Sequence, residues 1–289
     1  EGVILNVDFL KNCSMGKPTG MGKKVIVLGG GNVAFDCARS AKRLGAEEIH
    51  VACLEAREHM TADKEEIQQA AEEGILVHPA QTFERITGTG HVTGVDFMNV
   101  KSFTFDENHR AVIHREENSE HHIEADTVIF AVGQRPDITE EAGLALGRGN
   151  SIAVRDIETD KATSVDGIFA AGDAIYGTKS VIMAIESGRE AAAQIDQYLG
   201  GNGDISEKLA PEQKPDAYIG ICEGFGYMQR KNRCIDSPES RCNNFELFDH
   251  GICDSDICAE AGRCLQCDLR LQISKPGVWG DYAEGKGEK

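Results

Sequence analysis

A glycine-rich turn between an apolar run and a helical pattern is the feature that most constrains this chain. Residues 24–28 form a short, continuous apolar run of the kind found in buried parallel strands. Residues 32–44 then repeat apolar side chains at helical spacing, and residues 49–54 form a second strand-like run. This order of strand, tight turn, helix and strand predicts a βαβ unit, and with it an α/β fold built on a doubly wound sheet.

The turn itself fits the pattern G-x-G-x-x-A of a dinucleotide-binding loop. Gly29 allows the tight turn, Gly31 lets the backbone approach a pyrophosphate, and Ala34 is small enough for the helix to pack against the strand. Amides at the start of the helix can hold phosphate oxygens. A glycine turn that serves packing alone is the alternative, but the flanking strand and helix favour the nucleotide. The candidate binding residues are Gly29, Gly30, Gly31, Asn32, Val33 and Ala34.

Glu55, just after the second strand-like run, bears on the choice of nicotinamide. An acidic side chain at this place can accept hydrogen bonds from ribose hydroxyls and repels a 2′-phosphate. The alternative is that Glu55 is an ordinary surface residue and that Arg57 contacts a phosphate instead. We expect NAD(H) to be favoured over NADP(H).

The rest of the chain alternates between helical and strand patterns. Residues 61–74 predict an acidic helix capped by its first residue, a Thr. Alternation and turn residues from 83 to 130 predict antiparallel strands, and residues 127–132 predict a return strand into the main sheet. Residues 167–171 predict another short buried strand, and residues 180–198 predict a long helix.

Charge and composition narrow the partners. The formal net charge of −18 repels phosphate backbones, so we expect no nucleic acid as a partner. No run approaches the roughly 20 apolar residues that span a bilayer, and we expect neither a membrane span nor a secretory leader. Seven of the ten cysteines fall between Cys222 and Cys267. Without a secretion signal, such a cluster favours metal binding over disulfides and a cytoplasmic location.

Residues 22–39, GKKVIVLGGGNVAFDCAR, resemble the small subunit of glutamate synthase and its relatives in the pyridine nucleotide-disulfide oxidoreductase superfamily. The segments Met60-Thr61-Ala62 and Glu65-Glu66-Ile67 also resemble that family. The resemblance covers the chain to about residue 200 and, more weakly, to Asp268. It implies a Rossmann-type nicotinamide domain inserted into an FAD domain. Relatives specific for NADPH usually carry two arginines where this chain has Leu54-Glu55, which also favours NADH.

Two further segments resemble the flavin-binding parts of that family. Residues 131–137, AVGQRPD, include Gly133 and resemble the crossing out of the nicotinamide domain, and residues 167–173, GIFAAGD, resemble the second FAD motif. Asp173 after Gly172 would accept a hydrogen bond from a ribityl hydroxyl. A helix starting near Ser180 and Val181 would point its positive end at the flavin pyrimidine. The family's first FAD motif is not found in these residues, so we expect FAD in the intact protein and only the second part of its domain here.

The tail holds a candidate metal site. Cys264-Leu265-Gln266-Cys267 resembles the opening of a cluster-binding motif of the family. Together with Cys253 and Cys258, it supplies four thiolates within fifteen residues, which suit an iron–sulfur cluster or zinc by ligand type. Single-electron transfer from a flavin favours the cluster, and a tail with unliganded thiols is the alternative.

The expected division is a partial FAD domain in residues 1–19 and 135–200, the NAD(P)-binding domain in 20–134 and an irregular, cysteine-rich tail in 201–289. The expected function is hydride transfer between NAD(P)H and FAD, with electrons passing on to an iron–sulfur centre or a partner subunit. Hydride transfer requires no protein acid or base, so no catalytic residue is predicted. Two alternatives stay open. One is a glutamate-synthase-like small subunit, and the other is a nucleotide-binding fragment without flavin or activity.

Overall fold

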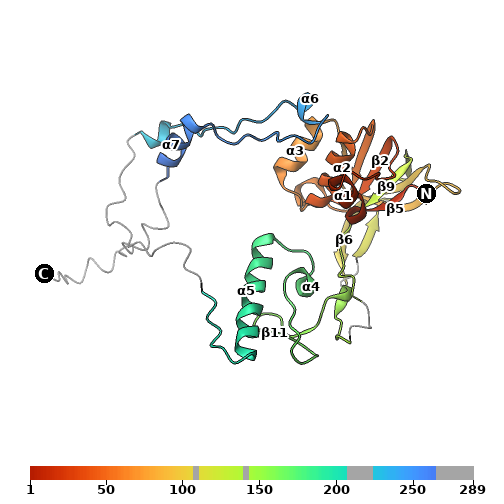
Figure 1. The fold of residues 1–289 in the computed structure, drawn as a ribbon. Coiled ribbons are helices and arrows are strands. Elements are labelled where there is room, and N and C mark those ends of the chain that lie inside the picture. Colours follow the sequence, from red (N-terminus) through yellow and green to blue (C-terminus); the bar gives the residue numbers. More distant parts are fainter. Residues whose placement is uncertain (107–110, 139–142, 207–223, 265–289) are drawn as a thin grey trace, which may run out of the picture. The chain divides into compact units, whose positions relative to one another are not determined.

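A computed structural model describes residues 1–106, 111–138, 143–206 and 224–264 of the chain (Figure 1). The chain divides into two compact units. The first joins Glu1–Ser206 to a separate segment, Pro238–Phe245, and the second comprises Glu207–Ser237 and Glu246–Lys289. The return of residues 238–245 to the first unit is not visible in the sequence pattern. The expected divisions at residues 19, 134 and 200 stay predictions.

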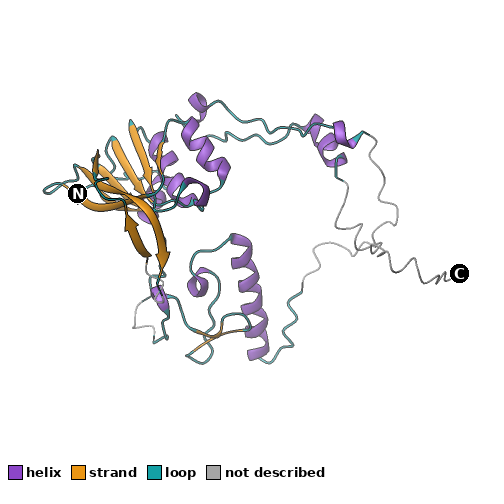
Figure 2. Ribbon diagram, turned by 180° about the vertical axis from the view of Figure 1, so that it is seen from behind, coloured by secondary structure: helices purple, strands orange, loops and turns teal. Residues whose placement is uncertain are grey.

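A parallel five-stranded sheet forms the centre of the first unit, with strand order β1-β9-β2-β3-β4 among the described residues. The strands are β1 (Val3–Leu5), β2 (Lys24–Leu28), β3 (Glu48–Ala52), β4 (Leu76–His78) and β9 (Thr127–Phe130). The helices between them are α1 (Asn6–Ser14), α2 (Asn32–Arg43) and α3 (Lys64–Glu72), with a short 3₁₀ turn η1 at Arg57–His59. Figure 2 shows these helices on one side of the strands. The predicted strands at 24–28, 49–54 and 127–132 are confirmed.

Apolar side chains cover the sheet on both faces, which explains the continuous apolar run of β2. Val25 and Val27 face the helices and pack with the fully buried Phe9 of α1 and Phe35 of α2. Ile26, the residue between the two valines, belongs to a second core on the opposite face. Burial on both faces is the usual condition of a parallel strand.

An antiparallel meander covers the second face. It consists of β5 (Gln81–Thr87), β6 (Gly94–Phe105), β7 (Ala111–Arg115) and β8 (His121–Glu124), with both β7 and β8 paired to β6. Val95 and Phe97 of β6 are buried against Leu28 and Val128 of the main sheet. The antiparallel strands predicted between residues 83 and 130 are therefore confirmed. Together with the parallel sheet they confirm the α/β, Rossmann-type fold class.

The predicted helix after residue 61 exists, but its predicted cap is wrong. The helix begins at Lys64, and Asp63 caps it by accepting a hydrogen bond from the Glu65 amide at 2.9 Å. Thr61 lies outside the helix because its neighbour Ala62 donates its amide to the Gly30 carbonyl at 3.1 Å instead.

Residues 143–206 contain a 3₁₀ turn η3 (Arg148–Asn150), strands β10 (Val154–Asp156) and β11 (Asp160–Thr163), and helices α4 (Asp173–Tyr176) and α5 (Val181–Tyr198). The predicted long helix is confirmed as α5. The strand predicted at 167–171 is wrong, because this segment forms only an isolated bridge between Ala162 and Phe169. Gly167 has a positive φ of 76°, which turns the chain sharply and leaves no room for a longer ladder.

The remaining elements are η4 (Phe225–Tyr227), α6 (Pro238–Arg241) and α7 (Asp254–Gly262). Helix α6 belongs to the first unit, whereas η4 and α7 belong to the second. Among the described residues no helix is both long and apolar enough to cross a bilayer.

Candidate functional site

A pocket of about 770 Å³ lies at the carboxyl ends of β2, β3 and β9, where a parallel sheet of this kind binds its ligands. The glycine loop forms one wall, Cys53 to Glu55 form a second, and Val132 to Gln134 form a third. Phe83 and Phe97 add apolar side chains from the meander to the lining. The pocket therefore brings together most of the nucleotide-site residues predicted from the sequence: Gly29, Gly30, Gly31, Asn32, Val33, Glu55 and Gly133.

The backbone conformation and the close packing at position 29 require a glycine whether or not a ligand is bound. The φ of Gly29 is +141°, and an added Cβ would lie 2.4 Å from the carbonyl oxygen of Ala131 on the neighbouring chain segment. Its amide donates to the Ala52 carbonyl at 2.8 Å, which fixes the turn at the end of β2. Any side chain at this position would push the loop away from the sheet.

Gly31 is different, because nothing in the described chain demands a glycine there. Its φ of −94° suits any residue, and an added Cβ would meet only the Thr61 hydroxyl at an ordinary 3.5 Å. The absent side chain leaves open space beside the backbone at the entrance to α2. A ligand that approaches the backbone closely, as a pyrophosphate does, would use that space.

The first turn of α2 offers free donors next to Gly31. Ala34 donates its amide to the Gly31 carbonyl at 2.9 Å, whereas the amides of Gly31, Asn32 and Val33 have no partner within the described ranges. Unpaired amides at a helix start carry partial positive charge and bind anions. Ala34 itself is fully buried against the sheet, as the motif predicts, and does not line the pocket.

The side chain of Asn32 has a structural role that sequence reasoning missed. Its Oδ1 accepts a hydrogen bond from the Asp63 amide at 2.7 Å, and the Gly30 carbonyl accepts one from the Ala62 amide. These two bonds hold the segment before α3 across the glycine loop and place the Thr61 side chain in the pocket wall. The Met60-Thr61-Ala62 resemblance marked the segment without indicating that it would reach the loop.

Glu55 lines the pocket, whereas Arg57 does not. The Oε2 atom of Glu55 is 3.0 Å from where a Cβ on Gly30 would stand, so this carboxylate borders the glycine loop directly. Arg57 is exposed in η1 and is not among the residues that line the pocket. Burial, together with the negative charge of Glu55, raises the pKa of the neighbouring Cys53 thiol to about 12, so this thiol is neutral at physiological pH.

The residues predicted for flavin binding form a second, smaller hollow of about 340 Å³, lined by Asp173, Ser180 and Val181 among others. Asp173 accepts a hydrogen bond from the Lys179 amide at 3.3 Å, and Ser180 caps α5 by accepting from the Met183 amide. Gly172 does not line the hollow but turns the chain into α4 with a positive φ of 65°. Val181 is 78% exposed, so the start of α5 presents an apolar surface beside the carboxylate.

The structure does not assemble the predicted metal site from the residues it describes. Cys253 occupies the N-cap position of α7 without a capping hydrogen bond from its side chain, Cys258 lies within the helix and Cys264 follows it, and all three are exposed. No group of three or more potential metal ligands is found among the described residues. Cys267 lies outside them, so the four-cysteine site stays a prediction.

Comparison with known proteins agrees with this geometry. Residues 1–188 match the family model of the pyridine nucleotide-disulphide oxidoreductases. The chain is 32% identical to the NADP(+)-dependent formate dehydrogenase subunit beta of Moorella thermoacetica over 92% of its length, and 30% identical to the NADPH-Fe(3+) oxidoreductase subunit beta of Geobacter sulfurreducens over 90%. It is 35% identical to the glutamate synthase [NADPH] small chain of Azospirillum brasilense over 71% of its length. The chain spans 39%, 44% and 43% of these three relatives.

Solved structures share the fold at lower identity. FprA from Mycobacterium tuberculosis in complex with NADPH has a TM-score of 0.54 at 14% identity, over 68% of this chain and 58% of that one. The thioredoxin reductase of T. acidophilum has a TM-score of 0.50 at 22% identity, over 69% and 57%. With a family model that covers residues 1–188 and a glycine loop that opens onto a pocket at the sheet edge, the chain belongs to the pyridine nucleotide-disulphide oxidoreductase family.

Proposed function

We propose that this chain is the nicotinamide-binding part of a flavin-dependent oxidoreductase subunit. The observation that carries the proposal is the cradle at the start of α2, where Gly31 leaves space and the amides of Asn32 and Val33 are free of partners in the described part of the chain. Two phosphates of a dinucleotide fit such a cradle by charge and by close approach to the backbone. The apolar wall from Phe83 offers a surface for a ring.

The residues around α5 fit a flavin nucleotide. Asp173 supplies a carboxylate for a ribityl hydroxyl, and the start of an 18-residue helix, α5, supplies partial positive charge. When bound, FAD supplies a two-electron acceptor for the nicotinamide hydride. The chain's own residues bind, orient and exclude water, and none has to move a proton.

For the nicotinamide itself, we propose NADH. The carboxylate of Glu55 beside Gly30 would accept hydrogen bonds from a ribose and repel a 2′-phosphate. Arg57, the candidate phosphate contact, does not line the pocket. The named relatives are NADP(H) enzymes by their names, so this chain would differ from them in cofactor.

For the acceptor, we propose an iron–sulfur-bearing partner or tail. The two beta subunits match 92% and 90% of the chain and therefore include much of its cysteine-rich segment. The glutamate synthase small chain matches 71%, which makes a glutamate-synthase-like subunit the second candidate. A cytoplasmic location stays a prediction. The net charge of −18 is the basis for expecting no nucleic-acid partner, which also stays a prediction.

A substitution at Gly31 tests the nicotinamide site. Gly31→Ala is expected to leave the fold intact and to weaken NADH binding by about tenfold or more, because the methyl group keeps phosphate from amide bonds worth about 1.5–3 kcal/mol. Ser40→Ala, two turns further along the same helix, is the matched control and is expected to bind as the parent does. Binding is measured by NADH fluorescence titration, and far-UV circular dichroism checks the fold. Equal NADH affinity of Gly31→Ala and the parent would show that the dinucleotide phosphates do not bind at the start of α2.

Visible absorption before and after NADH is added without oxygen tests the flavin. Flavin bands that bleach support the oxidoreductase, and a broad shoulder that also bleaches supports an iron–sulfur cluster. A colourless full chain that still binds NADH would favour the nucleotide-binding module without flavin.

A further inference from the structure

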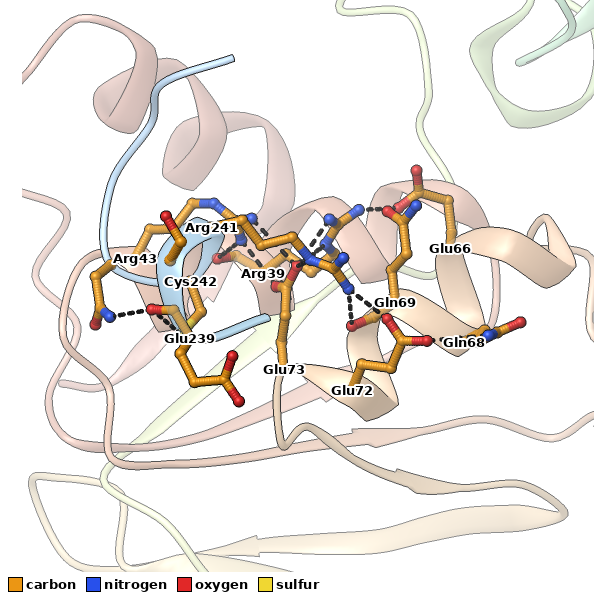
Figure 3. Close-up of polar contacts among 12 residues, drawn as sticks. Arg39, Arg43, Glu66, Gln68, Gln69, Glu72, Glu73, Glu239, Arg241 and Cys242 are labelled. Carbon is orange, nitrogen blue, oxygen red and sulfur yellow. Dashed lines mark hydrogen bonds and ion pairs between the residues drawn. The ribbon is translucent and has the colours of Figure 1, made fainter. Parts of the chain in front are cut away.

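Helix α6 lies against the end of α3, although its Arg241 follows Glu73 by 168 residues in the chain. This short helix and its neighbours, Pro238–Phe245, are grouped with the dinucleotide-binding unit, while the segments on both sides of them are grouped with the other unit. The side chain of Arg241 is only 3% exposed. An isolated piece of the cysteine-rich region is thus built into the surface of the nicotinamide domain (Figure 3).

The receiving group is Glu73, at the end of α3, whose side chain is fully buried. Arg39 and Arg43 of α2 hold its two oxygens at 2.8 and 2.9 Å. Burial alone would raise the pKa of this carboxyl, but the hydrogen bonds from the two arginines outweigh it and lower the pKa to about 2. Glu73 is therefore charged, and the two arginines of α2 orient its carboxylate.

Arg241 adds a third guanidinium to this carboxylate. Its Nε donates to Glu73 at 2.9 Å, and the same guanidinium donates to Glu72 at 2.7 Å and to the Gln69 carbonyl at 3.4 Å. The three acceptors come from the last turn of one helix, where a cation is also favoured by the helix dipole. A planar guanidinium can donate hydrogen bonds to all three acceptors at once. A lysine ammonium is a point charge that cannot reproduce this arrangement of donors.

The segments on either side of α6 pair with each other within the second unit. Ile235 and Asp249 form an isolated antiparallel bridge, and the Cys234 amide donates to the Gly251 carbonyl at 2.7 Å. The residues between them therefore form a closed loop with Arg241 near its tip. Cys234 lies at the base of this loop, and Cys253 follows it on the other side.

We propose that the end of α3 is a docking site for this loop and that Arg241 is its anchor. The occupant is the chain's own segment 238–245, an arginine-bearing helical turn, and the receptor is the acidic surface of Glu72 and Glu73 backed by the arginines of α2. Segment 238–245 is thereby held on the unit that contains α2 and α3. This anchor does not depend on which nicotinamide or metal the protein binds.

Amide hydrogen exchange on the full chain tests the anchor. Arg241→Gln is expected to speed exchange in peptides covering 238–245 at least tenfold, because the glutamine cannot span the three acceptors. Arg241→Lys keeps the charge but loses the planar guanidinium with its several donors. Its 238–245 peptides are therefore expected to exchange nearly as fast as those of Arg241→Gln. Arg155→Gln, which removes an exposed arginine with a distant partner at 3.9 Å, is the control for the charge change and is expected to match the parent.

Peptides from α2 and the central sheet distinguish docking from folding. In Arg241→Gln they are expected to keep their protection, because Arg39 and Arg43 still hold Glu73. Unchanged exchange at 238–245 in Arg241→Gln would overturn the proposal. Faster exchange throughout the sheet would also overturn it, since Arg241 would then be a core residue of the domain and not an anchor.

Discussion

Replacement of Glu73 by glutamine would remove the single carboxylate shared by three arginines. The side chain is fully buried, and its amide replacement would leave Arg39, Arg43 and Arg241 without their common counter-charge. A carboxyl whose pKa falls from 4.5 to about 2 on folding contributes roughly 3 kcal/mol at neutral pH. Breaking a buried ion pair by removing one partner costs a similar amount, about 3–5 kcal/mol. We therefore expect Glu73→Gln to be less stable than the parent by about 3 kcal/mol at pH 7.

The loss should depend on pH with a definite sign. Because folding lowers the pKa of Glu73, its contribution is complete above about pH 5 and declines as the pH falls from 4.5 towards 2. The difference in unfolding free energy between the parent and Glu73→Gln is expected to be constant from pH 8 to pH 5.5. Below that it should shrink, because the parent carboxyl is then increasingly protonated in the unfolded chain.

Urea denaturation followed by circular dichroism measures both the size and the sign of the effect. Unfolding free energies of the parent and Glu73→Gln are compared at pH 7, 5.5, 4.5 and 3.5. Glu47→Gln is the matched control, because among the described residues the Glu47 side chain makes only an exposed ion pair with Lys23, and its removal should change little at any pH. Equal stability of parent and variant at pH 7, or a difference that does not shrink at pH 3.5, would refute the reasoning.

Four further predictions follow from the site and its surroundings. Gly29→Ala should destabilise the domain by at least about 2 kcal/mol in thermal unfolding, since its methyl group would lie 2.4 Å from the Ala131 carbonyl; an unchanged Tm would contradict this. The parent should bind NADH on the order of tenfold more tightly than NADPH, and Glu55→Gln should remove most of that preference in titrations; a parent that prefers NADPH would exclude the proposed role of Glu55. Native alkylation with iodoacetamide, read by mass spectrometry, should spare Cys53 up to about pH 10, because its thiol pKa is about 12; rapid labelling at pH 8 would show that the thiol is not buried as described. Burial lowers the pKa of His78, so protonation of this histidine favours the unfolded chain. The urea concentration at the unfolding midpoint should therefore fall as the pH drops below about 6.5. His78→Gln should reduce this pH dependence, and an unchanged pH dependence in the variant would assign it to other groups.

Features that depend on residues close together in the sequence could be predicted from it. The run before Gly29 and the helical spacing after it predict β2, the turn and α2, because burial on both faces of β2 leaves only apolar residues there. The same local pattern places Glu55 at the edge of the pocket. Thr61 and Asp63 can both cap a helix by residue type, and the choice of Asp63 depends on the bond from its amide to Asn32, which no local pattern contains.

Long-range contacts could not be predicted from the sequence. Glu73 lies in the segment whose sequence predicts only an acidic helix, yet it is the buried partner of three arginines. Arg241 lies in a polar, irregular stretch whose composition gives no sign that it returns to the domain. Burial of both residues follows from the tertiary contact between α3 and α6 and not from propensity, so only the structure could show it.

The position of β9 between β1 and β2 has a consequence for how the chain folds during synthesis. Val25 of β2 pairs with Thr127, so one edge of β2 has no partner until the whole meander has been made. Until then the ribosome-bound chain exposes an unpaired strand edge next to the apolar Ile26 and Leu28, and such edges promote aggregation. A fragment that ends before Thr127 would therefore aggregate, whereas one that includes Phe130 could close the sheet.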